Sequence, residues 1–299
     1  METSPQATSF PTSASSSPYH PNSISPVFSS EIERERLHIQ HLASLALLDN
    51  KPLHAPVTNL KKIIDIGCGV NADMTLYLAS AFPSAKVYAL DLSEIKLETE
   101  KIPPNVEFIR GNFHHLIGVD PRMEEGTFDF VFSRYLCAGI EDWSAHVSKV
   151  ATLLRKGGWL EMHDAYSLSL WQNDQNLTAS TQWIQYVCPP KPWPANDPWA
   201  LQFFLSLLQK HGLEDVDGFG VSAPWERPPL RGEKARGNAW AEYVCGGKFF
   251  GWVEPIFERL VPGEEGRRKR EELVREARGS FEPSVGKEMR FAVFWGRKG

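Results

Sequence analysis

The chain has 299 residues, 42% hydrophobic and 11% aromatic, which is enough to bury a sizeable core in one large domain or two small ones. Its formal net charge of −5 argues against a broad nucleic-acid-binding surface, which is normally basic, so we expect no nucleic-acid partner. The four cysteines form no C-x-x-C pair, which predicts neither a disulfide framework nor a metal site.

The first thirty residues differ in composition from the rest of the chain. Residues 1–30 are rich in Ser, Thr and Pro, lack Lys and Arg, and predict a disordered tail before a folded domain at residues 31–299. No charged start with an apolar run indicates a signal peptide, and no apolar run is long enough to cross a membrane. We therefore expect a cytoplasmic protein without a membrane partner, with the nucleus as the alternative location.

An amphipathic helix is predicted at the start of the folded domain. Residues 31–49 are charged at first and then leucine-rich, with apolar residues near helical spacing. We expect this helix to cover the binding side of the core. His38 and His41 lie on it and are expected to be solvated surface residues.

The next segment predicts a nucleotide site. Residues 61–91, KKIIDIGCGVNADMTLYLASAFPSAKVYALD, have the order strand, glycine turn, helix, strand and acid, which is typical of a doubly wound α/β sheet. Gly67 and Gly69 carry no Cβ, so the backbone can turn tightly and approach a ligand closely. The helix after them directs unpaired N–H groups into the crevice. Asp91 ends the second strand, where its carboxylate can accept hydrogen bonds from a ribose diol.

Two nucleotide cofactors fit this pattern. Together with Ala72, the glycine pair matches the dinucleotide fingerprint, so an NAD-dependent oxidoreductase stays open. Two features favour S-adenosylmethionine. Asp65, two residues before the first glycine, can orient the turn and reach the amino-acid end of that cofactor, and Asn71 tolerates a left-handed backbone. The chain also lacks an obvious Tyr-x-x-x-Lys pair of short-chain dehydrogenases.

Residues at the ends of neighbouring strands are further candidates for cofactor contacts. Leu92 directly follows the ribose-binding acid. Residues 106–109 predict a third strand, followed by Asn112 and Phe113, which could hydrogen-bond to and stack on an adenine. Phe113 could equally belong to the core.

Two later strands bring polar residues to the same edge of the sheet. The alternating segment TFDFVFS predicts a fourth strand that delivers Ser133 and Arg134 to the carboxyl edge, where ligands bind in open α/β sheets. A fifth strand at residues 159–162 ends in His163 and Asp164.

The remaining sequence predicts cap segments interleaved with the last elements of the sheet. Residues 166–198 are rich in aromatics, prolines and amides, which suits either a lid over a planar or apolar substrate or a surface loop packed on the sheet. Residues 223–288 form a second cap segment, with a helix over residues 238–260. Its basic run at residues 267–270 indicates a solvated helix face rather than a nuclear signal.

Five segments, in this order, resemble the class I S-adenosylmethionine-dependent methyltransferases and, more narrowly, the fungal LaeA-like group: IIDIGCG, ALDLS, PPNVEF, FDFVFSRYLCAGIEDW and LLRKGGWLEMHD. The resemblance covers most of residues 31–298, and its most specific parts are SRYLCAGIEDW and RKGGWLE. It implies a Rossmann-like sheet of seven mostly parallel strands, with the last strand antiparallel and with helical and aromatic cap insertions.

The resemblance also implies roles for single residues. Asp65, Gly67 and Gly69 take the glycine-loop roles, and Asp91 takes the ribose role. Asn112 replaces an acid that is more usual in the adenine-contact motif. The segment after the glycine turn also lacks the glycine and aromatic that tend to follow in the family.

The function implied is methyl transfer to an oxygen or nitrogen of a small aromatic or apolar molecule of fungal secondary metabolism. Alignment of the reacting groups can supply about 7–11 kcal/mol, and a positioned base adds roughly 10²–10⁴-fold where a proton must leave early. His163 and Asp164 are the candidate catalytic residues, with His114, His115 and Tyr135 as substrate-positioning alternatives. The alternative function is a LaeA-like regulatory protein that controls secondary metabolism through partner proteins.

Overall fold

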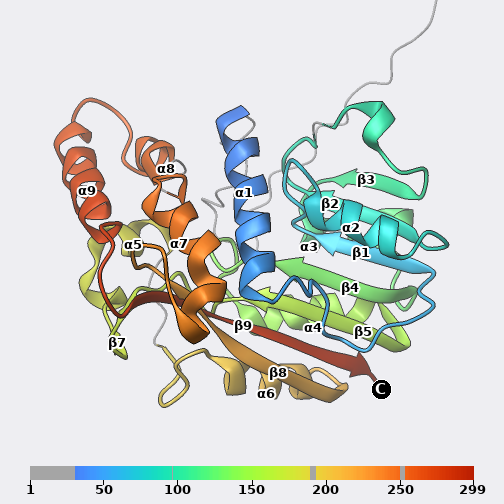
Figure 1. Ribbon diagram of the computed structural model, residues 1–299. Coiled ribbons are helices and arrows are strands. Elements are labelled where there is room, and N and C mark those ends of the chain that lie inside the picture. The colour runs from blue at the N-terminus through green and yellow to red at the C-terminus, as the bar shows by residue number, and fades with distance from the viewer. Residues whose placement is uncertain (1–30, 96, 189–192, 250–252) are drawn as a thin grey trace, which may run out of the picture.

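The computed structural model describes residues 31–95, 97–188, 193–249 and 253–299 (Figure 1). The tail predicted at residues 1–30 lies outside the described residues. No helix of the described part of the chain is both long and apolar enough to cross a membrane.

The described strands form one nine-stranded sheet with the order β3-β2-β1-β4-β5-β9-β6-β7, and β8 pairs with β9. In chain order they are β1 (Lys62–Ile66), β2 (Lys86–Asp91), β3 (Val106–Arg110), β4 (Phe128–Arg134), β5 (Leu154–Asp164), β6 (Trp171–Gln172), β7 (Gln175–Asn176), β8 (Leu213–Pro224) and β9 (Lys287–Lys298). Strands β1 to β5 are parallel, whereas β9 is antiparallel to both β5 and β8. The predicted mostly parallel sheet with an antiparallel last strand is therefore confirmed.

The sheet has two strands more than the seven predicted. The additional strands, β6 and β7, form a short antiparallel hairpin. Asn173 and Asp174 connect them with φ angles of 47° and 63°. Both residue types tolerate this left-handed conformation, which the tight turns of two-residue hairpins require. An Asn-Asp pair between short polar segments is too weak a signal to predict this hairpin from the sequence.

Helices cover both faces of the sheet, because alternate residues of each buried strand point to opposite sides. Ile63 packs in one cluster with Met74 and Leu78 of α2, whereas the neighbouring Ile64 packs in another with residues of α4 and α6, including Phe204. The described helices are α1 (Glu31–Leu47), α2 (Asp73–Ala81), α3 (Phe113–Leu116), α4 (Trp143–Leu153), α5 (Gln182–Val187), α6 (Leu201–Lys210), α7 (Asn238–Cys245), α8 (Val253–Leu260) and α9 (Arg267–Ser280). This arrangement is the doubly wound fold expected from the sequence.

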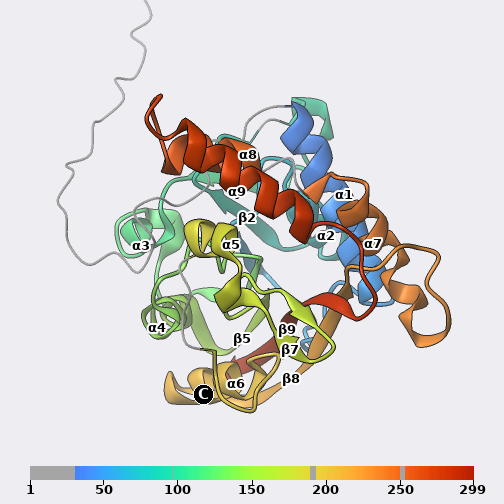
Figure 2. The same cartoon turned by 90° about the vertical axis from the view of Figure 1, so that its left-hand side faces the viewer.

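A helical cap lies beside the carboxyl ends of the parallel strands. Helices α1, α5, α7, α8 and α9 pack into one core with residues of β8 and β9, and this core includes the fully buried Trp183, Trp240 and Tyr243. Figure 2, viewed from the cap end, shows α5, α8 and α9 in front of the sheet. The single helix predicted over residues 238–260 is two helices, α7 and α8. The helices of this cap therefore lie at the N-terminal end of the described chain, within residues 166–198 and within residues 223–288.

Candidate functional site

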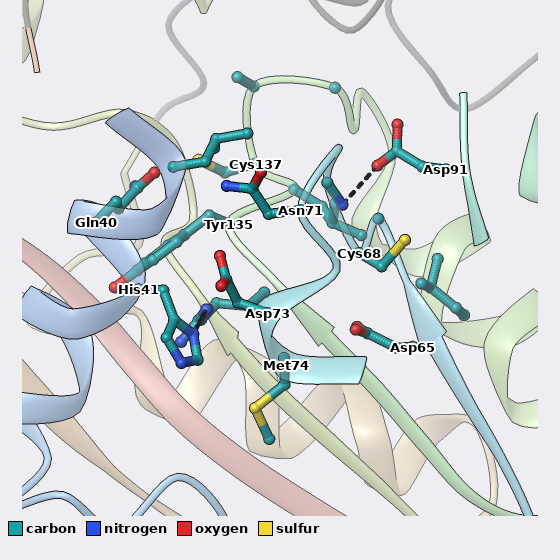
Figure 3. Close-up of a pocket in the computed structure, with 18 of the residues that line it drawn as sticks. Gln40, His41, Asp65, Cys68, Asn71, Asp73, Met74, Asp91, Tyr135 and Cys137 are labelled. Atoms are coloured by element: carbon teal, nitrogen blue, oxygen red, sulfur yellow. Dashed lines mark hydrogen bonds between the residues drawn. The ribbon is translucent and has the colours of Figure 1, made fainter. Parts of the chain in front are cut away.

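A cavity of about 340 Å³ lies at the carboxyl edge of the sheet, between the glycine turn and the cap (Figure 3). The turn after β1, the ends of β2, β3 and β4, helix α1 and cap residues line it. In the part of the chain that the structure describes, no three His, Cys, Asp or Glu side chains are arranged to hold a metal ion.

The glycine turn has the backbone geometry that only glycine adopts easily. Gly67 and Gly69 have φ angles of +73° and +70°, in the left-handed region. A Cβ on Gly67 would collide with the side chain of Leu136. A Cβ on Gly69 would have only one atom within 4 Å, the Leu37 Cδ1 at 3.6 Å, and so would project into the cavity. The turn therefore leaves open the space that a side chain would fill.

The Asp91 carboxylate lies against this turn. Its Oδ2 accepts a hydrogen bond from the Gly69 N–H at 2.9 Å (Figure 3). Its Oδ1 accepts one from the Ser93 N–H at 2.8 Å. An ionised carboxylate has about four lone-pair sites, so a carboxylate that holds a backbone turn can also bind a ligand hydroxyl. The structure thus brings together the acid and the glycines that the sequence predicted as one site.

Asp65 is buried at the base of the cavity. The Thr75 hydroxyl donates to Asp65 Oδ2 at 2.6 Å, and burial raises the pKa of Asp65 to about 6. Ionisation of the Asp65 side chain at neutral pH therefore lowers the free energy of unfolding.

Replacing Asp65 with Asn is expected to stabilise the fold at pH 8 by up to about 3 kcal/mol, because a shift of about two pKa units is worth that much. The amide oxygen can still accept the Thr75 hydroxyl. Since the pKa in the folded state is raised above 3.8, the penalty is complete above about pH 6 and disappears below about pH 4. Urea denaturation at several pH values measures the gain. A gain in the free energy of unfolding that stays constant from pH 8 to pH 4 would contradict the raised pKa of Asp65.

The candidate adenine contacts also line the cavity. Asn112 caps α3, because its side-chain oxygen accepts a hydrogen bond from the His114 N–H at 2.9 Å. Phe113 is 2% exposed and belongs to the core of one sheet face, so it is both a core residue and a lining residue. Leu92 lines the cavity beside Asp91.

Of the two candidate residues at the end of β4, one lines the cavity and the other does not. Arg134 lines the cavity and donates from Nη2 to His41 Nδ1 at 2.8 Å, whereas Ser133 is buried and is not a lining residue. The expectation of a solvated His41 is wrong, because the residue is 8% exposed and faces the cavity. Burial and the Arg134 charge lower the pKa of His41 to about 4, so it is neutral at pH 7. His38, in contrast, is exposed and contacts Asp73.

Neither candidate catalytic residue lines the cavity. His163 is fully buried and its Nε2 lies 2.7 Å from Glu161 Oε1. Asp164 accepts hydrogen bonds from the backbone N–H groups of Leu136, Cys137 and Ala165 at 2.6, 3.1 and 2.9 Å. Burial raises the pKa of Asp164 to about 7. The geometry gives this carboxylate the role of fixing the loop after β4, and that loop does line the cavity.

Tyr135, a predicted substrate-positioning alternative, lines the cavity, and an aromatic wall lies beside it that the sequence did not predict. Tyr135 has a φ of 58°, which is an outlier for a bulky residue, and its hydroxyl is 2.9 Å from Ser44 Oγ. Trp240, Phe249 and Phe291 line the cap side of the cavity. Among the described residues of the aromatic-rich segment at 166–198, Leu168 alone lines the cavity. Trp171 and Trp183 of this segment are buried elsewhere, whereas Tyr186 is 39% exposed.

The sheet, the glycine turn and the acid on the neighbouring strand define an α/β protein with a nucleotide-cofactor site. A family model described as a methyltransferase domain matches residues 33–217. Because this is more than half of the chain, the protein belongs to that methyltransferase family.

Relatives with assigned names are fungal proteins. The chain is 28% identical over 205 residues to the methyltransferase pytC of Aspergillus terreus, a match that covers 64% of this chain and 60% of pytC. It is 27% identical over 209 residues to the N-methyltransferase tcpN of Claviceps purpurea, covering 64% of this chain and 71% of tcpN. It is also 29% identical over 136 residues to the secondary metabolism regulator LAE1 of Cochliobolus heterostrophus, covering 44% of this chain and 42% of LAE1.

Proposed function

We propose that the protein is an S-adenosylmethionine-dependent methyltransferase that methylates an oxygen or nitrogen of a small aromatic or apolar molecule. The observation that carries the proposal is one cavity with two kinds of wall. On one side lie the glycine turn and the Asp91 carboxylate, and on the other lie cap aromatics such as Trp240. A nucleoside cofactor fits the first wall and an apolar acceptor fits the second.

The residues present fit this cofactor. The open space in front of Gly69 accommodates a ligand close to the backbone, and a carboxylate such as that of Asp91 can accept hydrogen bonds from a ribose diol. In this proposal Asn112 and Phe113 contact the adenine, Asp65 serves the amino-acid end, and Leu92 is a further cofactor contact; all four line the cavity, which supports these roles. When bound, the cofactor supplies a methyl group on a sulfonium, which is already an activated leaving group.

None of the candidate bases His41, His163 and Asp164 is suited to take a proton from the acceptor. His41 Nδ1 accepts the Arg134 hydrogen bond, so the proton of the neutral ring is on Nε2 and the ring cannot take another there. His163 and Asp164 do not reach the cavity. We infer that the rate depends on holding the acceptor in line in a site that excludes water, which can supply about 7–11 kcal/mol. An acceptor that is already a good nucleophile suits such a site.

Two measurements test the proposal. Calorimetry of the folded protein with S-adenosylmethionine should show binding, and its absence at millimolar cofactor would remove the proposal. Mass spectrometry of extracts with and without the gene should show a compound lighter by one methyl group when the gene is absent. The names of pytC and tcpN support a methyltransferase of this kind in fungal metabolism.

A second candidate function is regulation of secondary metabolism through partner proteins, in the nucleus. It is favoured by the relatives named as secondary metabolism regulators, one from Cochliobolus heterostrophus and one from Coprinopsis cinerea. Nuclear accumulation together with co-purifying subunits, and no accumulation of an unmethylated precursor in the deletion strain, would favour it. A cytoplasmic protein that methylates a metabolite would favour the first function.

A further inference from the structure

Helix α1 presents different residues to the two halves of the cavity. Arg34 and His41 face the glycine-turn half: Arg34 Nε donates to Asn71 Oδ1 at 3.3 Å, and His41 contacts Arg134. Arg36 lies on a second stripe of the helix together with Glu33, Gln40 and Ser44. Residues at these spacings share one face of an α-helix. That stripe contacts α7 and Tyr135. Residues of this second stripe therefore belong to the cap half.

A buried polar cluster lies on this second stripe. Arg36 is 7% exposed, and its Nε and Nη2 donate to the two carboxylate oxygens of Glu33 at 2.7 and 2.8 Å. Its Nη1 donates to the Tyr243 hydroxyl and, at 3.1 Å, to Gln40 Oε1. Glu33, Arg36 and Gln40 all line the cavity. Because the two charges neutralise each other in a bidentate pair, the cluster has no net charge to attract an ion.

Arg36 fixes the orientation of the Gln40 amide. A guanidinium can only donate hydrogen bonds, so the Gln40 atom that faces it must be the oxygen. The amide nitrogen, with two N–H donors, then points away from Arg36, and the described residues provide no hydrogen bond for it. Gln40 therefore offers neutral donors to whatever occupies this part of the cavity.

The surroundings of these donors are apolar and aromatic. Trp240, Phe249 and Phe291 are each at most 3% exposed and line the same half of the cavity. The Tyr135 ring meets the Phe291 ring edge-on at 5.6 Å. A flat apolar molecule fits among such rings. A hydrogen-bond donor in these surroundings selects a ligand with an acceptor atom beside it, because burying the donor without a partner costs free energy.

We propose that the cap half of the cavity binds a neutral, flat apolar molecule through an oxygen, such as a carbonyl oxygen, that accepts hydrogen bonds from the Gln40 amide. The Arg36–Glu33–Tyr243 cluster acts as the positioning group that holds this amide. The proposal rests on the proposed function, since it describes the acceptor molecule of that reaction, but it concerns binding alone and can be tested apart from catalysis.

Two probes of matched shape test whether the site recognises a ligand oxygen: 2-acetylnaphthalene, which carries a C=O group, and 2-isopropenylnaphthalene, which carries a C=CH₂ group in its place. Ligand-observed NMR titrations of the full chain should show the ketone binding about three- to tenfold more tightly, as expected for one net hydrogen bond. Gln40→Leu should abolish this preference. Gln209→Leu, on the exposed side of α6, is the matched control and should keep it. Calorimetry with S-adenosylhomocysteine is run on all three proteins.

The outcomes separate this proposal from the proposed function. Loss of the ketone preference in Gln40→Leu, with unchanged affinity for S-adenosylhomocysteine, supports it. Equal preference in wild type and Gln40→Leu, or no preference in the wild type, overturns it. Weaker S-adenosylhomocysteine binding in Gln40→Leu with the ketone preference intact also overturns it, because Gln40 would then serve the cofactor. If no protein binds S-adenosylhomocysteine, the proposed function fails, whereas the ratio of the two probes still decides the role of Gln40.

Discussion

Replacing Gly69 with Val is expected to reduce the affinity for S-adenosylhomocysteine at least about 100-fold. The φ of +70° at this position is unfavourable for a β-branched residue, and forcing it costs about 1–3 kcal/mol. The added side chain would also project into the cavity, and relaxation of the backbone would move the N–H that donates to Asp91 at 2.9 Å. Calorimetry on the folded variant measures the loss.

A substitution at a second glycine distinguishes the effect of backbone strain from the effect of blocking the cavity. Gly126 has a φ of +71°, but a Cβ there would meet nothing within 4 Å. It precedes β4 and therefore lies at the opposite edge of the sheet from the cavity. Gly126→Val should lose a similar amount of stability and keep its affinity for S-adenosylhomocysteine. If Gly69→Val bound this ligand as tightly as Gly126→Val does, the glycine turn would not be the cofactor site.

The part of the site that the sequence predicted is the part built from local structure. Gly67, Gly69 and Asp91 lie within one strand–helix–strand unit, and parallel pairing of β1 with β2 brings the acid beside the turn. The hydrophobic runs of the parallel strands, buried on both faces, also identified the sheet. Short-range pattern and sheet topology were sufficient there.

The cap half of the cavity could not be predicted in this way. It depends on contacts between residues far apart in the chain, such as Arg36 with Tyr243 and Ser44 with Tyr135. The aromatic content of residues 166–198 suited either a lid or a surface loop packed on the sheet, because content does not say which rings face a cavity and which fill a core. Trp183 of that segment and Trp240 of the other are both buried in the cap core, but of the two Trp240 alone also lines the cavity.

The strand-end residues show the same limit. His163 and Asp164 end β5 at the edge where ligands bind, which is why the sequence favoured them as catalytic residues. Whether a strand-end side chain reaches the cavity depends on the loop that follows the neighbouring strand. Here the loop containing Leu136 and Cys137 covers Asp164, and its backbone N–H groups donate to both carboxylate oxygens. Nothing in the sequence around Asp164 indicates those hydrogen bonds.

Replacing Arg36 with Met is expected to destabilise the fold by about 3–5 kcal/mol, because it leaves the buried Glu33 carboxylate without its partner. Burial alone would lower the pKa of Arg36, but Tyr243 and Glu33 more than offset this and raise it, so the guanidinium is charged in the wild type. The loss comes from the buried acid that has lost its bidentate contact with Arg36 rather than from the missing charge pair itself. Removing both partners, in Glu33→Leu with Arg36→Met, should therefore restore most of the stability.

Urea denaturation of the single and double variants measures this difference. The same substitution at an exposed ion pair is the control: Arg267 lies 2.8 Å from Glu264, with the two side chains 65% and 82% exposed. Arg267→Met should change the free energy of unfolding by no more than about 1 kcal/mol, as is usual for surface pairs. A double variant as unstable as Arg36→Met would mean that Arg36 stabilises the cap through Tyr243 and Gln40 rather than through Glu33. A stable double variant that loses the ketone preference would show that the cluster serves recognition more than folding.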